Sequence, residues 1–105
     1  MALGALSRAA AEGASEMADL AERVKSESSF PEALTTWADD LLRQWNELRS
    51  RTGSLAREVE GWVGPLTADQ ISRRTYYQEM VETLGREAQA IAQRIGTGSV
   101  LGGME

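Results

Sequence analysis

Apolar residues recur every seven positions along the middle of this chain, and this repeat constrains the fold more than any other feature. One row consists of Leu34, Leu41, Leu48, Leu55 and Trp62, and a second row, four positions further on, consists of Ala38, Trp45, Thr52 and Val59. Alternating spacings of four and three place both rows on one stripe of a helix. Such a stripe needs another helix to cover it, so the sequence predicts an all-α fold.

Two further segments carry the same kind of pattern. Residues 3–25 have rows Leu3, Ala10, Met17, Val24 and Leu6, Gly13, Leu20, and the third segment has Tyr77, Val81, Leu84, Ala88, Ile91 and Ile95. Pro31 and the glycines of residues 61–65 separate the segments, and Gly96 is typical of a helix end. We therefore expect an N-terminal amphipathic helix within residues 1–28, a long antiparallel hairpin over 29–96 with its turn at 61–67, and a flexible glycine-rich tail at 97–105. Together they would form a three-helix, coiled-coil-like bundle.

Local signals refine these boundaries. Ser29 with Glu32, and Thr67 with Gln70, have the spacing of a capping box at the start of a helix. Gly53 lies inside the second helix, but the heptad phase continues through it, so we expect one unbroken helix from about Pro31 to Glu60.

Composition excludes most catalytic chemistry. The 105 residues include no cysteine and no histidine, which removes the usual zinc ligands, the usual general base and every Ser-His or Cys-His arrangement. We therefore expect neither an enzyme nor a metal or cofactor site. The formal charge is −5 and each of the three segments is net acidic, which argues against nucleic acid as a partner. No apolar run is long enough to span a membrane.

The aromatic residues and the heptad rows are the candidate binding residues. We expect Trp45 to fill the seam between the second and third helices, Tyr77 to be buried, and Tyr76 to be exposed or interfacial. Trp37, just off the stripe, is the better candidate for contacting a partner, because aromatic residues often anchor interfaces. The partner would be another helical protein or a second copy. The residues expected to carry this assembly are Trp37, Leu41, Trp45, Leu48, Leu55, Val59, Tyr77, Leu84, Ile91 and Ile95.

Residues 31–96, with Trp62-Val63-Gly64 between two amphipathic helices, resemble the WXG-type small proteins of the bacterial type VII secretion system. In that family two long antiparallel helices are joined by a turn bearing Trp-x-Gly. Glycine allows a positive φ there, and tryptophan holds the helix ends together; Trp62 and Gly64 would set the turn here. The resemblance implies a homodimeric or heterodimeric four-helix bundle that is exported as a folded pair.

The N-terminus lacks the basic region of a cleavable signal peptide. We therefore expect a cytoplasmic location, or export without such a peptide as the resemblance implies. The family's Tyr-x-x-x-Asp/Glu export signal is missing, so this chain would be the partner that lacks the signal, or would not be exported. The alternative is a structural subunit of a phage, needle or spectrin-like assembly, which the coiled-coil pattern supports equally well.

Overall fold

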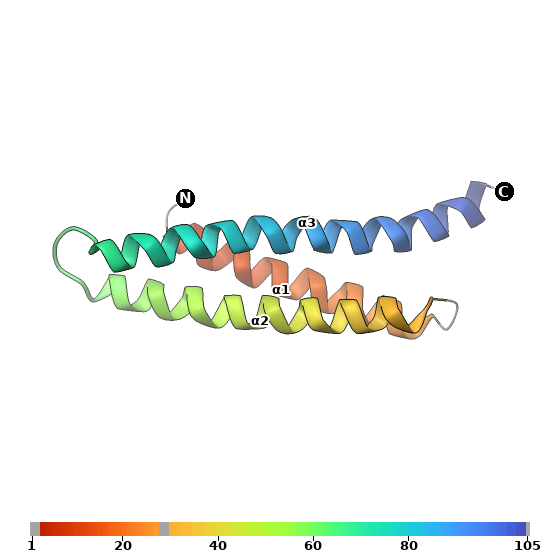
Figure 1. Cartoon of the computed structure of the whole chain (residues 1–105), viewed down its shortest axis with the longest axis horizontal. Coiled ribbons are helices and arrows are strands. Elements are labelled where there is room, and N and C mark those ends of the chain that lie inside the picture. The colour runs from red at the N-terminus through yellow and green to blue at the C-terminus, as the bar shows by residue number, and fades with distance from the viewer. Residues whose placement is uncertain (1–2, 28–29, 105) are drawn as a thin grey trace.

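The protein is an elongated bundle of three helices in the part of the chain that the computed structural model describes, residues 3–27 and 30–104, with side chains as far as Ile95. The helices are α1 (Leu3–Ser26), α2 (Glu32–Glu60) and α3 (Ala68–Met104). Helix α2 runs antiparallel to the other two, and α1 and α3 run in the same direction (Figure 1). The molecule measures 59 × 21 × 16 Å. The predicted all-α, three-helix fold is confirmed.

The helix boundaries agree with the sequence signals except at the C-terminal end. Helix α2 begins after Pro31, whose carbonyl accepts a 3.0 Å hydrogen bond from the Leu34 amide, and it continues unbroken through Gly53. Ser29 and its predicted capping box lie outside the described residues. Helix α3 does not end at Gly96 but continues to Met104. A glycine inside a helix costs about 1 kcal/mol relative to alanine, and no proline follows that would stop the helix.

The core lies along the centre of the rod and follows the heptad rows of α2. Both rows are buried from Leu34 to Leu55, and the buried Thr52 hydroxyl donates a 3.1 Å hydrogen bond to the Arg49 carbonyl. The first row stops there, because Trp62 has left the helix and is exposed. Helix α1 contributes the buried residues Leu6, Ala10, Ala14, Met17, Ala21 and Val24, and α3 contributes Tyr77, Leu84, Ile91 and Ile95.

Two of the predicted rows are therefore shifted or only half covered. In α1 the second buried row passes through Ala14 and Ala21, and not through Gly13 and Leu20 as the sequence suggested. These two residues stay partly exposed, as do Val81 and Ala88 on α3. The reason is packing. Of the three helix pairs, α1 and α2 pack together most extensively and α1 and α3 least, so the side of the bundle between α1 and α3 is incompletely closed.

Candidate interaction surfaces

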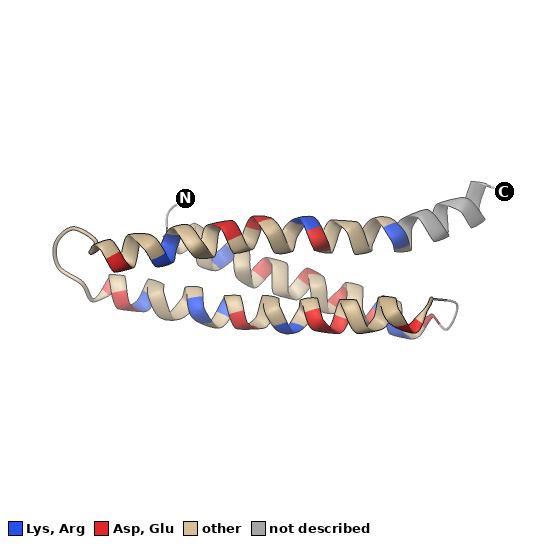
Figure 2. Cartoon of the chain, viewed as in Figure 1, with Lys and Arg blue, Asp and Glu red and all other residues tan. Residues whose placement is uncertain are grey.

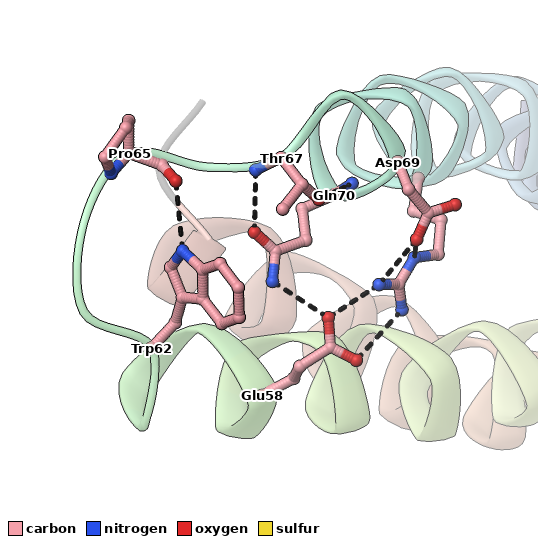
Figure 3. Close-up of polar contacts among 7 residues, drawn as sticks. Glu58, Trp62, Pro65, Thr67, Asp69 and Gln70 are labelled. Atoms are coloured by element: carbon pink, nitrogen blue, oxygen red, sulfur yellow. Dashed lines mark hydrogen bonds and ion pairs between the residues drawn. The ribbon is translucent and has the colours of Figure 1, made fainter.

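The loop between α2 and α3 is a closed turn held by its own hydrogen bonds. The amide of Trp62 donates to the Val59 carbonyl at 3.0 Å, and the indole Nε1–H of Trp62 donates to the Pro65 carbonyl, also at 3.0 Å (Figure 3). Gly64 has φ +110°, a conformation that L side chains rarely adopt. The predicted positive φ at the glycine of the Trp-x-Gly turn is therefore confirmed.

A polar clamp, formed by Glu58, Thr67, Asp69, Gln70 and Arg73, joins the two helices next to this loop (Figure 3). The predicted capping box is present: the Thr67 amide donates to Gln70 Oε1 at 2.9 Å, and the Gln70 amide donates to Thr67 Oγ1 at 3.1 Å. The amide group of Gln70 then donates from Nε2 to Glu58 Oε2 at 3.0 Å, across to α2.

Arg73 completes the clamp by binding carboxylates on both helices. Its Nη2 donates to Glu58 Oε2 at 2.6 Å, and its Nε donates to Asp69 Oδ2 at 2.9 Å. The hydrogen bond from Arg73 is the main reason why the pKa of Glu58 is lowered, and the bond from Gln70 lowers it further. In return, the bond to Glu58 raises the pKa of Arg73. The clamp therefore depends on an ionised Glu58.

The loop itself presents apolar side chains to solvent. Val63 is 95% exposed and Trp62 is 46% exposed, and we call this pair the apolar tip. Residues 61–68 contain no charged side chain, and the loop is tan throughout in the charge view (Figure 2). Ile71, in the first turn of α3, is 43% exposed. The apolar tip thus stands on a loop whose conformation is fixed by the turn and by the polar clamp.

A second surface is a groove between α1 and α3 with a volume of about 450 Å³. Trp45 of α2 also lines it, and the walls carry mainly small or aliphatic residues, among them Gly13 and Leu20 of α1 and Val81, Gly85 and Ala88 of α3. Trp45 is 3% exposed, and its Nε1–H is buried without an acceptor among the described residues. Its six-membered ring lies against Gly13, where no side chain could fit.

The structure places most of the residues predicted for assembly inside the single chain. Helix α1 covers the α2 stripe, so these residues form the core of one molecule. Those fully or nearly buried are Leu41, Trp45, Leu48, Leu55, Tyr77, Leu84, Ile91 and Ile95, and Val59 is partly buried. Tyr76 is exposed, as expected, and meets Tyr77 edge to face with ring centroids 5.8 Å apart.

The most exposed tryptophan is Trp62, and not Trp37, which the sequence suggested as the partner contact. Trp37 packs partly against the core, and the guanidinium of Arg94 lies over its ring, 5.3 Å from the centroid. Trp62 is the large exposed one, because it sits in the loop beyond the end of the α2 stripe. The sequence signal that could have identified the apolar tip is the run of uncharged residues around Trp62-Val63.

Comparisons of the chain with protein families, with curated proteins and with solved structures find no match. Among the described residues no helix combines the length and the apolar character needed to cross a membrane. The same part of the chain contains no group of three or more acidic side chains placed to hold a metal ion. The apolar tip and the groove are therefore the features on which a functional proposal can rest.

Proposed function

We propose that this protein is a non-catalytic helical interaction subunit, similar to the WXG-type secretion-associated proteins, which binds another helical protein or a second copy of itself. The observation that carries the proposal is the apolar tip. Val63 is almost fully exposed and Trp62 about half exposed, on a loop that hydrogen bonds and a positive-φ glycine hold in one conformation.

The tip has the physical properties of an interface anchor. Aromatic side chains that enter a partner's pocket dominate many interfaces, and a group that is already ordered loses little conformational entropy on binding. The Trp62 indole N–H is satisfied by Pro65 within the loop. The ring can therefore be buried against a partner without leaving an unpaired donor, which would cost about 1–3 kcal/mol.

The test is the solution mass of the purified chain by light scattering, first alone and then mixed with the product of the adjacent gene. A one-to-one complex, or a stable homodimer, that is lost in Val63→Asp would support the proposal. Asn46→Asp makes the same charge change at an exposed site on α2, remote from the tip, and should leave the complex intact. Circular dichroism should show that both variants keep the helix content of the native chain.

Two results would contradict the proposal. A complex that forms equally well with Val63→Asp would show that the tip is not the binding surface. A large homopolymer, with no one-to-one complex, would favour the alternative role as a structural subunit of a larger assembly, for which the rod shape of the bundle is the supporting observation.

A further inference from the structure

The groove between α1 and α3 is bordered by heptad positions that the single chain does not bury. Gly13 and Leu20 continue one apolar row of α1, and Val81 and Ala88 belong to the apolar row of α3. All four are only partly buried, whereas the equivalent rows facing α2 are closed. Residues repeated at heptad spacing are complementary to another helix. Apart from Gly13, against which the Trp45 ring lies, these positions are therefore available for contact with a further helix.

The length of the groove suits one face of a short helix. Its wall on α1 extends from Ala9 to Leu20 and its wall on α3 from Val81 to Ala92, and each wall is about 16 Å long at 1.5 Å per residue. Helices α1 and α3 run in the same direction, but α1 slopes away from α3 toward α2 along its length, so the groove widens toward the C-terminal end of α1 (Figure 1). Gly85 projects no side chain, and a Cβ built there would meet no atom within 4 Å, so a guest helix could approach α3 closely at this position.

Charge indicates which kind of helix would fit. The α1 wall carries the exposed carboxylates of Glu12 and Glu16, one helical turn apart, and neither takes part in an ion pair in the described part of the chain. The polar residue on the α3 wall is the neutral Gln89, and no lysine or arginine lines the groove. Two copies docked groove to groove would bring these carboxylates together, whereas a basic helix would bring opposite charges against them.

We propose that this groove binds an amphipathic helix of a partner protein that has small and aliphatic residues on its inserted face and lysine or arginine along the flank next to α1. This inference rests on the proposed function and specifies the face used and the chemistry of the partner. It concerns a surface separate from the apolar tip, so each can fail without the other.

The test uses the full chain, labelled with ¹⁵N, and a synthetic alanine-rich peptide of about 16 residues, with leucines on one face and lysines on one flank. Amide shift changes in the NMR spectrum should be concentrated on the groove walls, around Gly13 and Gly85. The same peptide with glutamate in place of lysine should bind at least tenfold more weakly. Added salt should weaken the binding of the lysine peptide, because the carboxylates of Glu12 and Glu16 are exposed to solvent.

Gly85→Leu provides a variant that blocks the groove without unfolding the chain. Gly85 lines the groove and a Cβ built there meets no atom within 4 Å, so a leucine fits without overlap and takes up space that a guest helix would need. Gly53→Leu is the matched control, since it is also in mid-helix, lies outside the groove, and has only the end of the Arg57 side chain at 3.9 Å. Binding should be lost in the first variant and kept in the second.

Reversing the rim charges gives an independent readout. The double variant Glu12→Lys and Glu16→Lys should prefer the glutamate peptide over the lysine peptide. The inference is overturned if the shift changes map outside the groove, if Gly85→Leu binds as the native chain does, or if the two peptides bind equally. It is also overturned, in favour of a second copy, if the chain alone forms a dimer that Gly85→Leu abolishes.

The two proposals can be separated by combining the variants. If Val63→Asp abolishes the complex with the natural partner while Gly85→Leu has no effect, the proposed function stands and the groove inference fails. If the lysine peptide binds the groove but Val63→Asp leaves the natural complex unchanged, the groove inference stands and the role of the apolar tip fails.

Discussion

The indole ring of Trp45 on α2 lies directly against the backbone of Gly13 on α1. A Cβ built at Gly13 would come within 2.7 Å of Cε3 of that ring and still closer to Cζ3 and Cη2. The largest side chain of the core therefore packs against a residue that has none. This contact allows α1 to approach α2 closely along the middle of the rod, and it explains why a glycine is found within a helix otherwise rich in alanine.

Gly13→Ala should destabilise the protein although it raises helix propensity. The added methyl group would overlap the Trp45 ring, and overpacking of this kind costs about 1–3 kcal/mol. Gly85→Ala is the control, because its Cβ meets no atom within 4 Å; it should stabilise the protein by up to about 1 kcal/mol. Urea unfolding followed by circular dichroism measures both. Equal effects of the two substitutions would contradict the close contact.

A double-mutant cycle tests whether Trp45 is the cause. Trp45→Phe shortens the ring and also removes a buried N–H that has no acceptor among the described residues. In that background Gly13→Ala should cost clearly less than in the native chain, with a coupling energy of about 0.5–3 kcal/mol. Additive effects would show that the alanine methyl clashes with something other than the indole.

Gly64→Ala should destabilise the turn at the apolar tip. Gly64 has φ +110°, so an alanine there would be strained by about 1–3 kcal/mol. Gly61→Ala, three residues earlier, should be neutral or mildly stabilising, because Gly61 has φ −86° and the nearest atoms to its Cβ lie at 3.9 Å. In thermal unfolding, Gly64→Ala should therefore lower the Tm, whereas Gly61→Ala should leave the Tm unchanged or raise it slightly.

The polar clamp should make stability depend on pH through Glu58. Arg73 and Gln70 hold the pKa of Glu58 below its ordinary value of about 4.3. A carboxyl whose pKa is lowered by folding stabilises the protein above its unfolded pKa, and this contribution is lost as the pH falls through the folded pKa. Glu58→Gln should thus lower the Tm near neutral pH, and the difference from the native chain should shrink below about pH 4. A difference independent of pH would contradict this role.

Trp62→Ala should loosen the loop. It removes both the ring and the Nε1 hydrogen bond to Pro65, whereas Trp62→Phe removes the bond but keeps a smaller aromatic ring. Hydrogen exchange at the loop amides should therefore be fastest in Trp62→Ala and intermediate in Trp62→Phe. Tyr76→Phe, an exposed aromatic outside the loop, is the control and should leave exchange in the loop unchanged. Unchanged exchange and thermal stability in Trp62→Ala would mean that the ring does not order the turn.

The fold could be predicted from the sequence because its determinants are periodic and local. Heptad rows indicated three helices, Gly64 indicated the positive-φ turn, and Thr67 with Gln70 indicated the start of α3. The predicted end of α3 at Gly96 was wrong, since Gly96 lies inside the helix. Glycine makes a helix less stable but does not prevent it from continuing.

The surfaces could not be predicted in the same way, because they depend on how the helices approach one another. The sequence did not show that Gly13 accommodates Trp45, and so it misplaced the second buried row of α1. It also suggested Trp37 as the partner contact, without indicating that Arg94, more than fifty residues away in the chain, would cover its ring.

The rod shape has a practical consequence for anyone who purifies this protein. Its radius of gyration is 16.6 Å, whereas a compact domain of this length would have about 13 Å. Elongated particles diffuse slowly and leave a gel-filtration column early, so calibration with globular standards would assign the single chain too large a mass. A monomer would then be mistaken for a dimer, and assigning its stoichiometry requires a method that does not depend on shape, such as sedimentation equilibrium.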